Sequence, residues 1–350
     1  MNETNLTPRQ NFILALINQS QAIGRSDVEE SLANRYPSSK PTIARDLAML
    51  VRKKLIKVSG KGKSTKYSAF LSNHLLRYID EKQYFTLEID QRSGATNFDF
   101  SLFNHLHDIF SVLEIENLNK INKSFAKESK KLPNDIYKRE LERFVIELSW
   151  KSSRIEGNTY SLLDTETLIK QSIKAAGHPK EEAIMILNHK AAFEILLTHK
   201  DKFKKITMSQ ITQLHNVLVK DLSITAGIRN EAVGITGTTY RPLDNNFQIR
   251  EALEKTIAAI NTVTFPLEKA LIALVFISYI QPFADGNKRT GRMLANAILM
   301  AQDYFPLSYR SADGTSFKEA LILFYEQHSI IHFKKILVNQ YRSALETYFK

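Results

Sequence analysis

The sequence contains no cysteine and one tryptophan among its 350 residues. Without cysteine, disulfides and thiolate metal sites are excluded, and a reducing compartment such as the cytoplasm is favoured. The longest apolar run, Ala270 to Ile280, reaches about half of the ~20 residues that a membrane-spanning helix needs. The polar N-terminus, MNETNLTPRQ, is unlike a signal peptide. These absences predict a cytoplasmic protein with no membrane partner.

Acidic residues are also scarce, because 48 Lys and Arg stand against 37 Asp and Glu, which leaves a net charge of +11. Such a balance favours polyanions such as nucleic acid or nucleotides, although a solvated basic surface has the same composition. The positive charge is concentrated between Val51 and Phe70, a stretch without any acid. The length and the ordinary hydrophobic content of 43% predict a globular protein of about two or three domains.

Three helical patterns, over residues 8–19, 26–36 and 38–56, precede this basic stretch. The stretch itself reads as a strand, a Gly-rich turn and a second strand. This order predicts a winged helix-turn-helix domain over residues 1–70, whose third helix and wing would contact DNA. The alternative is a winged helix that makes only protein contacts. The candidate DNA-binding residues are Lys40, Thr42, Arg45, Lys61, Lys63 and Lys66.

The rest of the chain is mostly helical by its apolar spacing. Residues 71–135 are mixed and predict a helical linker region. The clear interruption after residue 136 is Ala226 to Asn246, whose Gly, Thr and Asn predict a β-hairpin or extended flap. The expected fold class is therefore mainly α, with a small α+β domain in front.

A candidate phosphate-binding loop follows the apolar helix Glu268 to Ile280. Gly286 and Asn287 open the next helix, and the free N–H groups of a helix start attract anions. Arg289 and Arg292 lie three apart on one face of that helix, and guanidinium groups suit phosphate oxygens. Asp285, at the tip of the loop, is a candidate ligand for Mg²⁺.

The stretch QPFADGNKRTGR, Gln281 to Arg292, resembles the signature of the Fic family, His-Pro-Phe-x-Asp/Glu-Gly-Asn-x-Arg-x-x-Arg. Every fixed position matches except the first. SSRIEGN, Ser152 to Asn158, resembles the family's inhibitory motif, and the segment from Ala226 resembles its flap. The resemblance covers roughly residues 141–333. It implies a Fic domain over residues 136–350, all-helical with a β-hairpin flap, that transfers AMP from ATP to a Ser, Thr or Tyr hydroxyl of a target protein.

The resemblance also implies roles for individual residues, with ATP and Mg²⁺ as cofactors. Asp285 would bind Mg²⁺, and the nucleotide-binding set would be Gly286, Asn287, Lys288, Arg289, Gly291 and Arg292. The flap that clamps the target peptide as an added strand would be Ile235, Thr236, Gly237, Thr238, Thr239, Tyr240 and Arg241. An inhibitory helix near residues 145–157 would carry Ser152, Glu156 and Gly157, with Glu156 pairing with Arg292 in competition with phosphate.

Two positions depart from the family pattern. Gln281 stands where the family has its proton-accepting histidine, and an amide is no base near neutral pH. The loss of a positioned base typically costs about 10²–10⁴-fold in rate, so we expect nucleotide binding with crippled AMP transfer. Whether Gln281 is natural or introduced stays open at this point.

The second departure, Lys288, is shared with the phosphate-transferring relative Doc, whereas Arg292 favours AMP transfer. The alternatives left open are a nucleotide-sensing DNA-binding regulator without catalysis, a de-AMPylase and a Doc-like phosphotransferase. A homodimer is the assembly left open.

Overall fold

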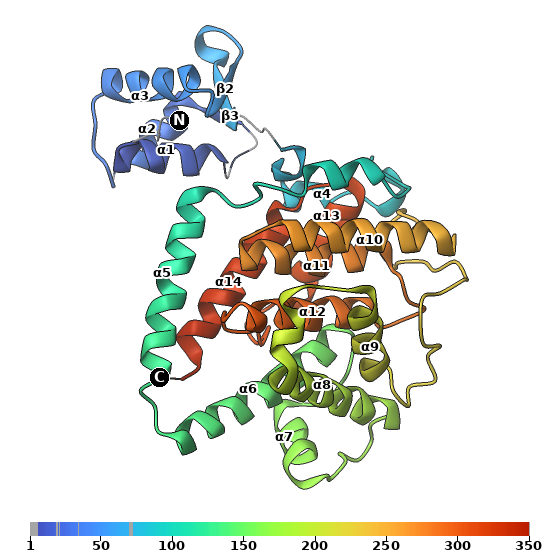
Figure 1. Cartoon of the computed structure of the whole chain (residues 1–350). Helices are drawn as coiled ribbons and strands as arrows, with labels where there is room; N and C mark the ends of the chain where they lie inside the picture. Colours follow the sequence, from blue (N-terminus) through green and yellow to red (C-terminus); the bar gives the residue numbers. More distant parts are fainter. Residues whose placement is uncertain (1–5, 19, 21, 34, 70–72, 350) are drawn as a thin grey trace. The chain divides into compact units, whose positions relative to one another are not determined.

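The computed structural model of the chain describes residues 6–18, 20, 22–33, 35–69 and 73–349. The chain divides into two compact units, Met1–Glu88 and Ile89–Lys350 (Figure 1). None of the described helices is both long and apolar enough to cross a membrane. The expected fold class, mainly α with a small α+β part, is confirmed.

In its described residues the first unit combines three core-forming helices and a separate four-residue helix with a three-stranded antiparallel sheet in the order β1-β3-β2. Tyr67 of the central strand pairs with Ile23 on one side and Val58 on the other. Buried aliphatic side chains from all three helices form one core under the sheet. The elements are α1 (Pro8–Asn18), β1 (Ile23–Gly24), α2 (Arg25–Ala33), α3 (Lys40–Arg52), β2 (Ile56–Ser59), β3 (Lys66–Ala69) and α4 (Glu81–Tyr84).

In the described part of the second unit, all the regular elements are α-helices or short 3₁₀ turns, joined by loops. Its helices are α5 (Val112–Ser129), α6 (Asn134–Ile155), α7 (Leu162–Gln171), α8 (Lys180–His199), α9 (Met208–Leu218), α10 (Asn246–Thr262), α11 (Pro266–Ile280), α12 (Asn287–Ala301), α13 (Gly314–Gln327) and α14 (Ile331–Thr347). In Figure 1 α11 and α12 lie in the middle of this unit, and α8, α9, α10 and α13 pack against them. Every residue of α11 from Leu267 onward is buried.

The expected linker region, residues 71–135, is divided between the two units. Its helix α5 packs on the second unit, where Asn122 accepts a hydrogen bond of 2.7 Å from the Tyr341 hydroxyl. Lys334 forms an ion pair of 2.7 Å with Glu114 at the start of the same helix. These long-range contacts attach α5 to the second unit rather than leaving it as a separate connector.

The segment expected to form a hairpin, Ala226 to Asn246, is an irregular loop with a turn at Thr236–Gly237. Its one bridge is an isolated parallel pairing of Arg241 with Asn97, a residue far away in the sequence. The Arg241 N–H donates to the Thr96 carbonyl at 2.8 Å. At Arg241 the backbone of this segment is therefore paired with residues 96–97 instead of with a second strand of its own.

Candidate functional site

The loop between α11 and α12 is shaped by two left-handed residues. Gln281 ends α11 with φ 50°, and Gly286 precedes α12 with φ 78°. Position 286 favours glycine for two reasons: the positive φ is a conformation that other residues rarely adopt, and a Cβ there would lie 2.9 Å from the Val219 side chain. These two conformations turn the chain sharply between the buried helix and the start of α12.

Asn287 locks this loop with its side chain. Its Oδ1 accepts from the Phe283 N–H at 2.9 Å, and its Nδ2 donates to the Phe283 carbonyl at 2.8 Å and to Gln281 Oε1 at 3.0 Å. All three bonds are internal to the loop. Both polar atoms of the Asn287 side chain, which was predicted to hold a phosphate, therefore form hydrogen bonds within the loop. A phosphate would be bound by the backbone N–H of Asn287 instead.

Gln281 is buried, with 8% of its surface exposed. Its side-chain Nε2 donates to the Ser278 carbonyl at 2.6 Å, and its main-chain carbonyl accepts from Arg229 Nε at 2.6 Å. With the bond from Asn287, both ends of the amide are held. The position that the sequence marks as the head of the loop is therefore fixed in orientation but carries no base.

The start of α12 presents positive charge. Among the described residues no side chain caps this helix, so its first N–H groups are available to an anion. The Arg289 guanidinium is buried, 3.1 Å from Asp285 Oδ2, and Lys288 is half-buried. Asp285 itself is 68% exposed at its side chain. Only the Asp285 carboxylate projects into solvent from this loop.

Arg292 is buried one turn further along α12 and is held by three hydrogen bonds from α6. Its NH1 donates to Glu156 Oε1 at 2.7 Å, its Nε to Ser152 Oγ at 2.9 Å and its NH2 to the Ser152 carbonyl at 2.9 Å. Burial alone would raise the pKa of Glu156, but Arg292, with help from Lys288, holds that pKa below its usual range. The sequence-predicted pair is therefore brought together as a charged contact.

The end of α6 explains why Glu156 faces this site. The helix ends at Ile155, Glu156 is its C-cap, and Gly157 follows with φ 101°, a conformation that favours glycine. The Asn158 N–H returns to the Ser153 carbonyl at 3.2 Å. The predicted helix end is present, and it fixes the glutamate one turn after Ser152.

Gly291, in the first half of α12, lies against the neighbouring helix α11. A Cβ at this position would lie 3.1 Å from the Leu274 carbonyl oxygen and 3.4 Å from its Cα. Gly291 therefore lies at the contact between α12 and α11, where it permits close approach of the two helices. Gly291 thus has a packing role, and its place in the nucleotide-binding set stays a prediction.

Comparison with known proteins agrees with this geometry. Residues 205–299, which include the loop and most of α12, match the sequence model of the Fic/DOC family. The chain contains a Fic domain. It is 29% identical over 223 residues to Protein adenylyltransferase Fic of Nematostella vectensis, covering 60% of this chain and 50% of that protein. It is 27% identical over 160 residues to Protein adenylyltransferase fic-1 of Caenorhabditis elegans, covering 44% and 31%.

Solved Fic structures share the fold. Fic-1 of C. elegans, residues 134–508, superposes with a TM-score of 0.57 at 20% identity, covering 67% of this chain and 72% of that one. A Fic domain protein of Bacteroides thetaiotaomicron gives a TM-score of 0.56 at 21% identity, covering 66% and 95%. The chain spans half or less of the length of the curated relatives named above.

The flap of this Fic domain is tied to its surroundings. The side chain of Tyr240, one of the predicted flap residues, is buried at 2% exposure, and its hydroxyl donates to the Tyr279 carbonyl at 2.9 Å. The Thr238 hydroxyl donates to Glu326 at 2.6 Å, and the Gly237 carbonyl accepts from Arg92 at 3.0 Å. The flap residues left exposed are Thr236, Thr239 and Arg241, with Ile235 half-buried.

Arg229 is a residue that sequence reasoning missed. It is 3% exposed and joins the base of the flap to the loop, because its guanidinium donates to the carbonyls of Gln281, Glu231 and Leu243. Its own N–H donates to the Pro282 carbonyl at 3.0 Å. All four partners are backbone groups. A lone arginine in a polar loop gives no local signal for such contacts.

His215 is a second residue without a sequence signal. Its ring stacks on Phe283 at 3.7 Å between centroids, and its Nε2 donates to the Asp285 carbonyl at 3.0 Å. Burial lowers the pKa of His215. A neutral imidazole thus contacts the loop through the Asp285 carbonyl and the Phe283 ring.

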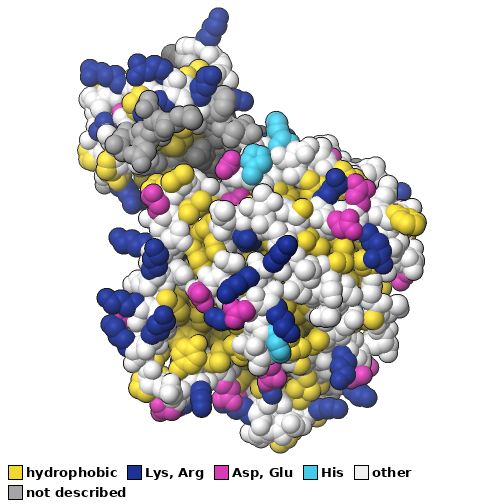
Figure 2. All heavy atoms as spheres, in the orientation of Figure 1, with side chains coloured by type: hydrophobic (Ala, Val, Ile, Leu, Met, Phe, Trp, Pro, Cys, Tyr) yellow, Lys and Arg dark blue, Asp and Glu magenta, His cyan; other side chains and the backbone are white. Residues whose placement is uncertain are grey.

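The first unit carries the predicted DNA-binding residues. Figure 2 shows Lys and Arg side chains spread over this unit. Lys40 and Arg45 on α3 and Lys61 and Lys66 near the strands are exposed. Thr42 is half-buried and its hydroxyl is bonded to Ser39 at the start of α3, at 2.9 Å. The side chain of Lys63 lies outside the described residues.

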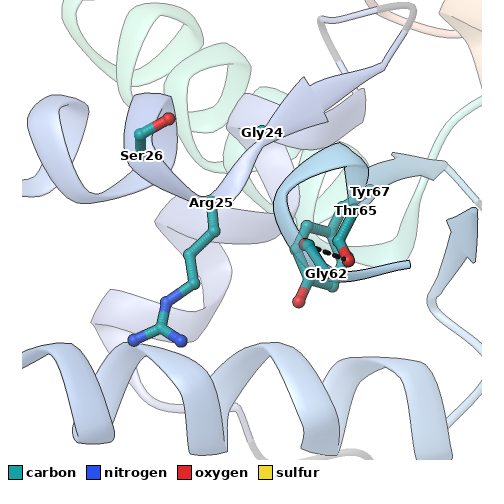
Figure 3. A pocket seen from close by; sticks show the side chains of 6 residues that line it. All are labelled: Gly24, Arg25, Ser26, Gly62, Thr65 and Tyr67. Atoms are coloured by element: carbon teal, nitrogen blue, oxygen red, sulfur yellow. Dashed lines mark hydrogen bonds between the residues drawn. The ribbon is translucent and has the colours of Figure 1, made fainter. Parts of the chain in front are cut away.

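A hollow of about 260 Å³ opens between the start of α2 and the turn that joins β2 to β3 (Figure 3). It is lined by Gly24, Arg25, Ser26, Gly62, Thr65 and Tyr67. The Arg25 guanidinium points away toward the start of α3, where it donates to the Lys40 carbonyl at 2.9 Å, and it also pairs with Glu29 one turn further along α2. The charged group beside the hollow is therefore already engaged with its own unit.

Proposed function

We propose that this chain is a Fic-type protein adenylyltransferase scaffold that binds ATP with Mg²⁺ and is held inactive by Glu156 and by Gln281. The observation that carries the proposal is the engagement of buried Arg292 by Glu156 beside the uncapped start of α12. A carboxylate in that place competes with a phosphate for one guanidinium. Glu156 would therefore guard a phosphate site.

The residues present fit a nucleotide with a magnesium ion. The N–H groups of α12, Arg289 and Arg292 would hold phosphate oxygens. Mg²⁺ is usually held by one or two carboxylates together with substrate phosphates. Asp285 supplies one exposed carboxylate, and the described residues contain no cluster of three or more acids and histidines that would form a protein-only metal cage.

The chemistry assigned to ATP is to supply AMP, with pyrophosphate as the leaving group. The attacking oxygen belongs to a Ser, Thr or Tyr hydroxyl of a target protein, and its proton must be accepted as the bond to phosphorus forms. Gln281 holds the place from which a side chain would accept that proton, but its amide cannot take it. The exposed part of the flap would position the target segment.

Calorimetric titration of the chain with ATP·Mg²⁺, paired with a transfer assay on the same sample, tests the proposal. We expect binding that weakens when Mg²⁺ is chelated, with no protein adduct. We also expect Glu156→Gly to tighten binding, because Arg292 is released to the phosphates. Absence of ATP binding in both forms would overturn the nucleotide assignment.

A second function, DNA binding by the first unit, is favoured by a separate observation. The unit has three helices and a hairpin of the kind found in winged helix-turn-helix proteins, with basic side chains exposed on α3 and beside β3. Lys40 and Arg45 would face the major groove, and Lys61 and Lys66 would contact phosphates. ATP binding and DNA binding together would make the chain a nucleotide-responsive regulator.

Gel-shift titrations with genomic fragments at several salt concentrations test the DNA assignment. We expect a salt-sensitive shift. The slope of log affinity against log salt should fall by about 0.9 for each phosphate that is no longer neutralised in Lys61→Ala or Lys66→Ala. Lys123→Ala is the matched control, since it removes an exposed lysine from α5 in the second unit. An equal decrease of the slope in all three variants would contradict the assignment.

A further inference from the structure

His189 lies behind the contact between Arg292 and Glu156 and has no part in the phosphate loop. It comes from α8 and is fully buried. Its Nε2 is 2.8 Å from Ser152 Oγ on α6, and its Nδ1 is 2.8 Å from the Met185 carbonyl one turn earlier in α8. The imidazole therefore joins two helices through hydrogen bonds at both nitrogens.

The partners of His189 define its tautomer. A backbone carbonyl can only accept a hydrogen bond, so the hydrogen must be on Nδ1, which donates to the Met185 carbonyl. Ser153 Oγ lies 3.3 Å from the same nitrogen. Burial lowers the pKa of His189 to about 3, so the ring is neutral. Nε2 then has a lone pair, and the Ser152 hydroxyl must donate to it.

This donation determines what Ser152 offers to Arg292. A serine hydroxyl has one hydrogen and two lone pairs. With the hydrogen directed at His189, a lone pair is left for Arg292 Nε, which lies 2.9 Å away. The same arginine reaches Glu156 through NH1 at 2.7 Å. A continuous row of hydrogen bonds thus runs from Met185 through His189, Ser152 and Arg292 to Glu156.

We propose that His189 is a positioning residue of the inhibitory contact, because it orients the Ser152 hydroxyl so that Arg292 is held against Glu156. The inference rests on the proposed function, in which Arg292 is shared between Glu156 and a phosphate. Without His189, the Ser152 hydrogen is free to turn toward the guanidinium, where two donors would oppose each other. Arg292 would then leave Glu156 more readily.

Titration of the full-length chain with ATP·Mg²⁺ tests the positioning role. One well-placed neutral hydrogen bond corresponds to about a fivefold change in an equilibrium, so His189→Phe should raise ATP affinity about fivefold. His189→Gln, whose amide oxygen can accept where Nε2 does, should stay close to the unmodified chain. In a Glu156→Gly background, His189→Phe should have no further effect.

The outcomes separate the two hypotheses. An equal effect of His189→Phe in both backgrounds indicates general packing and overturns the inference. The inference is also overturned if Glu156→Gly raises ATP affinity but His189→Phe has no effect on it. If Glu156→Gly leaves ATP affinity unchanged, the proposed function fails instead, and a measurement without nucleotide decides on His189.

That measurement is ¹⁵N NMR of the histidine side chains. We expect His189 as the Nδ1–H tautomer at neutral pH, with an Nε2 resonance that shifts in Ser152→Ala. His215 is the internal reference, because its Nε2 faces the Asp285 carbonyl at 3.0 Å and it should show the opposite tautomer. An Nε2–H tautomer at His189, or no shift in Ser152→Ala, would overturn the inference.

Discussion

Gln281→His combined with Glu156→Gly should enable the chain to attach AMP to protein hydroxyls, a reaction that we expect the unmodified chain not to perform. A positioned general base contributes about 10²–10⁴-fold to rate. The second change releases Arg292 from its carboxylate partner. We expect the gain in the double variant to exceed that of either single variant, because each change removes a different obstacle.

The surroundings of Gln281 suit an imidazole. Its Nε2 donates to the Ser278 carbonyl at 2.6 Å, and the side chain is buried against the loop. A histidine can make the same donation from Nδ1–H, which leaves the other nitrogen unprotonated to accept a proton. The left-handed backbone at position 281 tolerates histidine better than a β-branched residue.

Mass spectrometry of the variant, incubated with ATP·Mg²⁺ and candidate proteins, distinguishes the outcomes. A mass increase of one AMP group supports AMP transfer, and an increase of one phosphate group supports the Doc-like phosphotransferase alternative. Gln281→Asn with Glu156→Gly is the matched control, since it has the same opened site and no base. If the histidine double variant binds ATP yet modifies no protein, itself included, the catalytic assignment is wrong.

The backbone of the loop between α11 and α12 could be predicted from sequence because its geometry is local, whereas its phosphate-binding role stays a prediction. Gln281 to Arg292 contains the turn residues, the helix start and the basic side chains within a few turns. Gly286 shows the left-handed conformation that such a turn requires. The helix end at Gly157 is equally local, since a glycine after a helical run is a common C-cap.

The flap could not be predicted in the same way, because its partners are distant in sequence. Polar and β-prone residues indicated a hairpin, but Arg241 pairs with Asn97, and Thr238 bonds to Glu326. Tyr240 is buried by stacking on Tyr279 at 4.7 Å between centroids. No short-range pattern distinguishes such a docked loop from a free hairpin.

Gly291 and His189 show a different limit. Gly291 lies inside the signature stretch, yet the space around it is determined by Leu274 on the neighbouring helix. His189 lies on an ordinary buried helix face, and its contact with Ser152 arises only when α6 and α8 pack together. Contacts made by a neighbouring helix therefore constrain both residues, and the local sequence does not show such contacts.

Arg292→Ala should cost the second unit about 3–5 kcal/mol in free energy of unfolding, the usual cost of removing one partner from a buried ion pair. Arg292 is 1% exposed and Glu156 19%, so the carboxylate would stay largely buried without its cation. The variant should also bind ATP more weakly, because the same guanidinium is assigned to a phosphate. Denaturant titration and calorimetry measure the two effects separately.

Arg310→Ala is the matched control for this variant. Arg310 pairs with Glu147 at the same 2.7 Å, in the same unit, but 46% of its side chain is exposed. The Glu147 carboxylate is only 5% exposed, but it would keep the hydrogen bond that the Tyr348 hydroxyl donates to it, so Arg310→Ala should also cost stability while leaving ATP affinity unchanged. A comparable decrease of ATP affinity in both variants would argue against a specific role for Arg292.

The pH dependence of the stability that Arg292→Ala loses shows whether the loss comes from the charge of Glu156. Because the pKa of Glu156 is held below its unfolded value, the pair contributes stability at neutral pH that is lost as pH falls through the folded-state pKa. In Arg292→Ala the uncompensated carboxylate can accept a proton and become neutral in acid. The difference in unfolding free energy between the two proteins should therefore shrink below the ordinary glutamate range. A deficit that stays constant from neutral pH into acid would show that it comes from packing alone, and not from the charge of Glu156.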